Sequence, residues 1–188
     1  MKIVVIGETQ VGKTCLLRRL YANAFTNNIP QTIGAAFQNY VIQTPKGKTE
    51  LQLWDTAGQE KFRSLTPMYY RLAAFAVICF DLTNKASFEA LESWYTDIIE
   101  KGPPRIQFVI VGNKKDCHED RVIQFEEAMN FAESHGAAFY IETSAKTGEN
   151  VHELFLRIAQ IYESKPENVE VYPDDNLKEK DASKSKCC

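Results

Sequence analysis

The stretch GETQVGKT, residues 7–14, directly follows the apolar run KIVVI. When a strand leads into a glycine-bounded loop and then into a helix, successive backbone N–H groups converge and can bind phosphate oxygens. The spacing of Gly7, Gly12 and the Lys-Thr pair that follows matches the P-loop pattern. In that pattern Lys13 reaches the β- and γ-phosphates, and the hydroxyl of Thr14 binds Mg²⁺. A tight turn with a solvated lysine is the alternative, but the expected strand and helix on either side favour a phosphate site.

Short apolar runs alternate with amphipathic segments along the chain. We expect helices at residues 13–21 and from about residue 149, and strands at residues 2–6, 36–44, 50–55, 74–82, 106–114 and 137–143. Continuously apolar strands that alternate with helices are typical of a parallel sheet covered on both faces. The sequence PKGK predicts a hairpin turn. The predicted fold class is therefore α/β, with a six-stranded, mostly parallel sheet, one antiparallel edge strand and helices on both faces.

The composition sets broad limits on the class of protein. The 188 residues are 44% hydrophobic and 25% charged, which is ordinary for a globular chain, and residues 1–164 are expected to form one domain. Residues 165–188 have no helical or strand period and are rich in charge, so we expect a disordered tail. The formal net charge of -3 does not favour nucleic acid as a partner. No secretory signal or membrane-length apolar run is found, which predicts a cytoplasmic chain.

The five cysteines are an odd number and are scattered along the chain, so the sequence does not indicate a disulfide framework. Cys15 and Cys79 lie in apolar stretches and are expected in the core. The pair Cys117-His118 suggests a metal site, but two adjacent ligands cannot form a tetrahedral site and no partner pair has suitable spacing. We therefore expect no metal at these side chains.

Three clusters of polar residues each follow an expected strand: DTAGQE at residues 55–60, NKKD at 113–116 and TSAK at 143–146. In doubly wound sheets ligands bind beyond the carboxyl ends of the strands, so all three clusters should border the P-loop. Asp55 is placed to hold Mg²⁺ through a water, although an aspartate that caps the next helix is the alternative.

The cluster after Asp55 also supplies candidates for phosphate chemistry. Gly58 allows a backbone N–H to approach a γ-phosphate, and Gln59 can orient an attacking water because its amide both donates and accepts. The expected catalytic residues are therefore Gln59, Lys13 and Gly58.

The NKKD cluster predicts selection of the base. Guanine presents two donors, N1–H and N2–H₂, on its Watson–Crick edge, and the carboxylate of Asp116 can accept both. Adenine would leave that carboxylate unpaired, and such a mismatch in a dry site rejects a ligand by roughly 10⁴ to 10⁵. With Asn113 and Lys114 beside it, Asp116 indicates a guanine nucleotide.

Taken together, GETQVGKT, Thr32, WDTAGQE, NKKD and TSAK resemble the Ras-like small GTPases over residues 2–163. The stretches TIGAAF, LQLWDTAGQEKFRSLTPMYYR and CFDLTNKASFEALESW and the terminal CC resemble the Rab family, and IGAAF is most similar to the early-endosomal group. The resemblance implies the P-loop fold of small G proteins. It also implies a switch in vesicle trafficking that hydrolyses GTP to GDP slowly, is accelerated by a GTPase-activating protein and uses Mg²⁺.

The resemblance also assigns roles by position. Thr32 would join Thr14 and Asp55 on Mg²⁺, Phe25 would stack on the guanine, and the stems of Lys114 and Lys146 would flank it. The Ala145 N–H would meet guanine O6. The nucleotide-binding residues implied are Gly7, Thr9, Gln10, Val11, Gly12, Lys13, Thr14, Cys15, Phe25, Thr32, Gly58, Asn113, Lys114, Asp116, Ser144, Ala145 and Lys146.

Partners follow from the same resemblance. Phe37, Trp54 and Tyr69 would face effectors, although composition alone predicts that they lie in the core. Cys187 and Cys188 would be geranylgeranylated, and two lipid chains give stable anchoring to a membrane. A monomer is expected to cycle between cytosol and membrane, with an exchange factor, an activating protein, a prenylation escort and a GDP-dissociation inhibitor as partners.

Two alternatives remain at this point. A P-loop kinase or ATPase would prefer ATP and have an arginine-rich lid, which Asp116 and the arginine-poor connections disfavour. A nucleotide-locked scaffold would scarcely hydrolyse GTP. Thr9 stands where Ras itself has a glycine and can crowd the hydrolytic geometry, which favours the scaffold, whereas Gln59 disfavours it.

Overall fold

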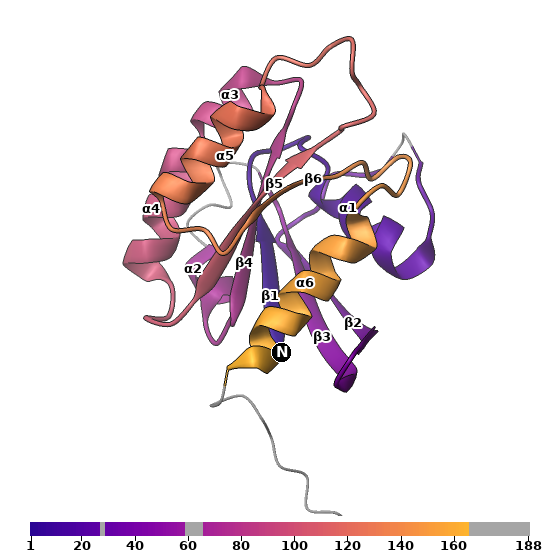
Figure 1. The fold of residues 1–188 in the computed structure, drawn as a ribbon, viewed down its shortest axis with the longest axis vertical. Coiled ribbons are helices and arrows are strands. Elements are labelled where there is room, and N and C mark those ends of the chain that lie inside the picture. The colour runs from indigo at the N-terminus through magenta and orange to yellow at the C-terminus, as the bar shows by residue number, and fades with distance from the viewer. Residues whose placement is uncertain (27–28, 59–65, 166–188) are drawn as a thin grey trace, which may run out of the picture.

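The computed structural model describes residues 1–26, 29–58 and 66–165 of the chain (Figure 1). The elements in chain order are β1 (Lys2–Ile6), α1 (Lys13–Ala22), β2 (Ala35–Thr44), β3 (Gly47–Thr56), α2 (Thr66–Tyr70), β4 (Phe75–Asp81), α3 (Lys85–Glu89), α4 (Leu91–Lys101), β5 (Gln107–Asn113), α5 (Phe125–Ser134), β6 (Tyr140–Glu142) and α6 (Val151–Ser164).

The strands form one six-stranded sheet in the order β2-β3-β1-β4-β5-β6. Only β2 and β3 pair antiparallel, and the other neighbours are parallel. The antiparallel pair closes at Pro45 and Lys46, and Gly47 takes a φ of 135°, which a glycine adopts without strain. The predicted mixed sheet and its hairpin are confirmed.

Helices cover both faces of the sheet, with α1 and α6 on one side and α3, α4 and α5 on the other (Figure 1). Alternate residues of β1 point to the two layers: Ile3 and Val5 pack in the layer of α1 and α6, and Val4 and Ile6 pack in the layer of α4 and α5. Burial on both faces explains why the strands are continuously apolar rather than alternating.

The last three strands are shorter than their apolar runs predicted. The clearest case is β6, which spans Tyr140–Glu142 rather than residues 137–143. Leu82 lies beyond the end of β4 yet is buried, so apolar character extends past the end of that strand into a packed connection. Residues 166–188, where a disordered tail is predicted, lie outside the described residues. No helix in the described part of the chain has the length and apolar character needed to cross a membrane.

Removing a buried side chain from α6 tests this packing. We expect Phe155→Ala to lower the free energy of unfolding by about 3–5 kcal/mol, because Phe155 is fully buried and its loss leaves a cavity. Gln160→Ala, at an exposed position of the same helix, should change it by less than about 0.5 kcal/mol. Urea unfolding at a fixed nucleotide concentration measures both, and equal stability of Phe155→Ala and wild type would contradict the packing described.

Candidate functional site

A cavity of about 600 Å³ lies where the loops at the carboxyl ends of the strands meet. Most of the predicted nucleotide-binding residues line it: Thr9, Gln10, Gly12, Lys13, Thr14, Cys15, Phe25, Thr32, Gly58, Asn113, Lys114, Asp116, Ala145 and Lys146. The cavity lining does not include Gly7, Val11 and Ser144, but each of them forms a hydrogen bond to a lining residue. Gln59 lies outside the described residues. The prediction that these loops meet at one edge of the sheet is confirmed.

Lys13, the first residue of α1, is buried against the backbone of the P-loop. Its side chain is 6% exposed, and its ammonium donates to the carbonyls of Gly7 at 2.8 Å and Glu8 at 2.7 Å. Burial lowers the pKa of Lys13, and nearby negative groups, Asp55 and Glu8 among them, oppose that shift. The loop thus presents a desolvated cation that an anionic ligand would stabilise.

Close packing around this loop explains two of its glycines. Gly12 has a φ of 96°, and a Cβ added there would lie 2.3 Å from Asn113 Nδ2. A Cβ on Gly58 would lie 2.5 Å from Lys13 Nζ, so the chain after β3 passes directly against the P-loop lysine. Any side chain at either position would displace a neighbour.

Glu8 ties the P-loop to the layer of helices on the other face. Its Oε1 accepts a hydrogen bond of 3.0 Å from Nε1 of Trp94 in α4. The same residue offers its carbonyl to Lys13, so the position of that carbonyl depends on α4. Sequence reasoning missed Trp94, because its hydrophobic spacing in α4 indicates only core packing.

Three oxygen-bearing side chains meet beside Lys13. Thr14 Oγ1 donates to Asp55 Oδ2 at 2.6 Å, Thr32 Oγ1 donates to the same oxygen at 3.3 Å, and the two hydroxyl oxygens are 2.9 Å apart. Burial raises the pKa of Asp55, although the threonine hydrogen bonds and Lys13 oppose the shift. The alternative that Asp55 caps a helix is wrong, because it lies within β3 and its carboxylate points to Thr14.

This group fits a magnesium ion. Asp55 Oδ1 is buried and has no hydrogen-bond partner among the residues that the structure describes, so one carboxylate oxygen stays available. Mg²⁺ prefers oxygen ligands and usually takes one or two from the protein, with water and phosphate oxygens supplying the rest. Across residues 1–26, 29–58 and 66–165 no group of three or more His, Cys, Asp or Glu side chains could hold a metal.

Asp116 lies at the opposite end of the cavity. Its Oδ1 accepts a 2.6 Å hydrogen bond from Ser144 Oγ, while Cys117 Sγ donates to its Oδ2 at 3.6 Å and Lys146 Nζ lies 3.7 Å from that oxygen. Burial acts to raise the pKa of Asp116, but the hydrogen bonds and Lys146 outweigh it and hold the pKa below its usual value. The carboxylate is therefore ionised and ready to accept two donors.

Asn113 joins the two ends of the cavity. Its Nδ2 donates to the carbonyl of Val11 at 2.8 Å, and its Oδ1 accepts from Thr143 Oγ1 and from the Ala145 N–H, both at 3.2 Å. Asn113 is therefore a brace between the P-loop and the TSAK loop. The Ala145 N–H, which the resemblance directed at guanine O6, donates to this brace in the present structure.

Two further side chains differ from what their sequence context predicted. Cys79 is buried in the core as expected, but Cys15 is half-buried and lines the cavity. Lys114 lines the cavity, and its ammonium pairs with Asp81 Oδ2 at 2.6 Å. Asp81 lies at the end of β4 and carried no motif that would have identified it.

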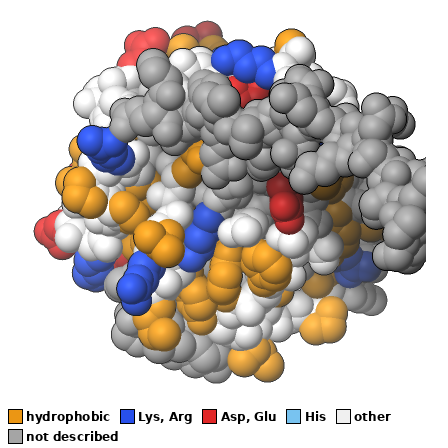
Figure 2. Space-filling view, turned by 90° about the horizontal axis from the view of Figure 1, so that it is seen from below, with side chains coloured by type: hydrophobic (Ala, Val, Ile, Leu, Met, Phe, Trp, Pro, Cys, Tyr) orange, Lys and Arg blue, Asp and Glu red, His pale blue; other side chains and the backbone are white. Residues whose placement is uncertain are grey.

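An aromatic cluster lies on the face of the β2–β3 pair that packs with the layer of α4 and α5. The ring of Trp54 is 5.3 Å from that of Phe37 and 6.0 Å from that of Tyr69, and Lys2 Nζ lies 4.5 Å from the Trp54 ring centre. Phe37 is 50% exposed, so the expectation from composition that it lies in the core is wrong. Seen from below, one face of the molecule likewise shows hydrophobic side chains gathered beside lysine and arginine side chains (Figure 2).

Arg19 in α1 is a further residue that sequence reasoning missed. Its guanidinium donates to the carbonyls of Ala145 at 2.9 Å and Lys146 at 2.6 Å, across 126 and 127 positions of the chain. Arg19 belongs to none of the motifs identified in the sequence, and its side chain is half-buried in the structure. No local sequence pattern signals a contact over that separation.

Known proteins resemble this chain over most of its length. The Ras family model matches residues 2–164. Ras-related protein Rab-19 of Xenopus laevis is 42% identical over 159 residues, which cover 85% of this chain and 75% of the relative. Ras-related protein Rab-4B of Homo sapiens is 41% identical over 173 residues, covering 92% and 81%, and RABF2b of Arabidopsis thaliana is 41% identical over 159 residues, covering 85% and 79%. With the P-loop, the paired threonines and the ionised Asp116 in one cavity, the chain belongs to the Rab branch of the Ras family, whose members hydrolyse GTP to GDP.

Proposed function

We propose that this protein is a switch in vesicle trafficking whose cavity holds a guanine nucleotide, with the phosphates at Lys13 and the base at Asp116. The observation that carries the proposal is the arrangement of charge in this cavity: a buried cation at one end and an ionised, hydrogen-bonded carboxylate at the other. The first suits phosphates and the second suits the paired donors of guanine. Adenine offers no such pair of donors, which argues against a kinase or ATPase.

The phosphate end would act mainly by positioning and charge. The P-loop N–H groups and Lys13 bind the phosphates, while Thr14, Thr32 and Asp55 supply the protein's oxygen atoms for Mg²⁺. When bound, Mg²⁺ neutralises charge that develops on the phosphate oxygens. Gly58 lies against Lys13 and can present its N–H to the γ-phosphate, and Gln59, the next residue, would orient the attacking water.

Slow hydrolysis follows from the residues that surround the phosphates. Residues 7–14 and 29–34 contain no arginine that could stabilise the transition state from within the chain. We expect an activating protein that supplies such a group to accelerate hydrolysis by about 10³ to 10⁵. The same reasoning favours a timer over a nucleotide-locked scaffold, since Gln59 is present.

Thr32 would connect hydrolysis to a change of shape. It contacts Thr14 and Asp55 in the present structure, and in the GTP-bound state the γ-phosphate and Mg²⁺ would strengthen that arrangement. Loss of the γ-phosphate would release Thr32 and Gly58 together. The residues that follow Thr32 lead into Phe37, so effectors that contact Phe37, Trp54 and Tyr69 would sense the nucleotide.

Membrane cycling completes the proposal. Geranylgeranyl groups on Cys187 and Cys188 would anchor the protein to the cytosolic face of a membrane, with an escort protein and a GDP-dissociation inhibitor handling the lipids. An exchange factor and an activating protein would set the nucleotide state. The IGAAF stretch supports an early-endosomal or other endocytic compartment by resemblance.

Replacing the base-selecting carboxylate tests the placement of the nucleotide. We expect Asp116→Asn to lower GDP affinity by about 10²- to 10⁴-fold, because an amide cannot accept both guanine donors and loses the charge-assisted hydrogen bonds. Xanthosine diphosphate, whose base has a carbonyl where guanine has its amino group, should gain affinity. Competition binding against a fluorescent nucleotide measures both. Asp120→Asn, at an exposed position of the same loop, is the matched control, and unchanged guanine preference in Asp116→Asn would refute the placement.

Removal of Mg²⁺ tests the role of Asp55. Chelation should accelerate GDP release from wild type, whereas Asp55→Asn should release GDP rapidly with or without chelator. Because the folded state raises the pKa of Asp55, the ionised carboxylate costs stability at neutral pH, and the neutral amide should leave the Mg²⁺-free melting temperature equal or higher. Glu50→Gln, exposed on the same strand, should behave as wild type. Chelator-sensitive release from Asp55→Asn would contradict this assignment.

A further inference from the structure

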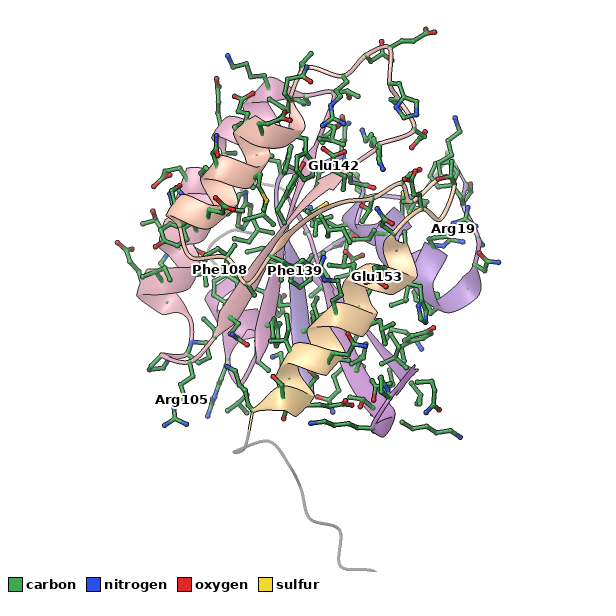
Figure 3. All side chains as sticks on the ribbon, viewed as in Figure 1. Arg19, Arg105, Phe108, Phe139, Glu142 and Glu153 are labelled. Carbon is green, nitrogen blue, oxygen red and sulfur yellow. The ribbon has the colours of Figure 1, made fainter. Side chains whose placement is uncertain are left out.

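Arg19 connects three parts of the chain near the Asp116 end of the cavity. Besides its hydrogen bonds to the carbonyls of Ala145 and Lys146, its Nη1 donates to both the backbone oxygen and Oδ1 of Asn23, each at 3.0 Å. Figure 3 labels Arg19 beside α1, close to the loop that leads into α6. One guanidinium thus makes four hydrogen bonds in the planar geometry for which arginine is suited.

The TSAK loop packs on the arginine as well as bonding to it. Gly148 has a φ of 91°, and a Cβ added there would lie only 3.4 Å from Arg19 Cδ. The loop is closed by a 2.8 Å hydrogen bond from the Gly148 N–H to the Ser144 carbonyl. The guanidinium of Arg19 holds two consecutive carbonyls, and Gly148 packs against the aliphatic part of the same side chain. These contacts fix the orientation of the peptides between Ser144 and Gly148.

That loop controls the groups proposed to read the base. Ser144 holds the carboxylate of Asp116 at 2.6 Å, and Ala145 and Lys146 line the cavity. On the other side of Arg19, Asn23 is the left-handed residue that ends α1 and lies two positions before Phe25, which also lines the cavity. Arg19 therefore contacts both the TSAK loop and the end of α1, the two segments that border the expected base site.

We propose that Arg19 is a positioning residue for the guanine base, setting nucleotide retention and base discrimination without touching the nucleotide. This inference rests on the proposed placement of the base at Asp116. Arg19 lies six positions after Lys13 in α1, about 9 Å along the helix axis, so the phosphate chemistry is separated from it. The loss of Arg19 should therefore affect release and selectivity much more than hydrolysis.

The test compares four variants of the full chain loaded with GDP or GTP in Mg²⁺. Arg19→Ala removes the clamp, Arg19→Lys keeps the charge with fewer donors, and Asn23→Gly keeps the left-handed backbone but removes the Oδ1 contact. Arg18→Ala is the matched control on the same helix. Three quantities are measured: the GDP dissociation rate, the ratio of GDP to inosine diphosphate affinity, and the single-turnover rate of GTP hydrolysis. Inosine lacks the amino group that Asp116 would read.

We expect Arg19→Ala to release GDP about 10- to 100-fold faster and to lower the ratio of GDP to inosine diphosphate affinity several-fold. The rate of GTP hydrolysis should stay within about two-fold of wild type. Arg19→Lys should recover part of the loss, Asn23→Gly should release GDP a few-fold faster, and Arg18→Ala should match wild type. If Arg19→Ala fails to fold, Asn23→Gly and Arg19→Lys carry the same comparison.

Two results would overturn the inference. Unchanged release and selectivity would show that the clamp is unnecessary, and a fall in hydrolysis matching the rise in release would show a general loss of structure. Asp116→Asn, measured in parallel, distinguishes a failure of the role of Arg19 from a failure of the proposed placement of the base. If it changes the GDP-to-inosine ratio while Arg19→Ala does not, only the role of Arg19 is wrong. If Asp116→Asn leaves the ratio unchanged, the placement of the base and the role of Arg19 both fail.

Discussion

The side chain of Asn113 makes the two halves of the nucleotide cavity one unit. It binds the Val11 carbonyl of the P-loop on one side and Thr143 and the Ala145 N–H on the other, and it is almost fully buried. Gly12 must be a glycine for Asn113 to approach so closely. Because the P-loop and the TSAK loop are both hydrogen-bonded to this amide, their relative position is set before any nucleotide binds.

The phosphate end is built from charges that are costly to bury. Lys13 is 6% exposed and Asp55 is 5% exposed. Burial lowers the pKa of Lys13 and raises that of Asp55, so it disfavours the charged form of each. Phosphate and Mg²⁺ would relieve both costs at once, which couples nucleotide binding to stability. Asp116 differs, because its hydrogen bonds keep it ionised without a ligand. The phosphate end would therefore couple nucleotide binding to stability, whereas the base end would set selectivity and share in retention.

Much of this arrangement could be predicted from the sequence, because the P-loop, the strands and the hairpin turn each depend on a short stretch of neighbouring residues. The P-loop spacing, the apolar runs and the PKGK turn predict a mostly parallel sheet with one antiparallel edge strand, and loops at the carboxyl ends of parallel strands meet at one edge. Contacts over long separations could not be predicted. The bond from Trp94 to Glu8, the pairing of Lys114 with Asp81 and the clamp formed by Arg19 depend on how helices pack onto the sheet, and no local pattern encodes that.

The central claim is that one cavity selects and holds a guanine nucleotide, and the nucleotide carried by the purified protein tests it most directly. Denaturing the protein in chelator and separating the released nucleotides identifies what was bound. The account predicts GDP or GTP in nearly equimolar amount with the protein. Protein that carries adenine nucleotide, or that is folded, empty and unable to take up GDP, would contradict it.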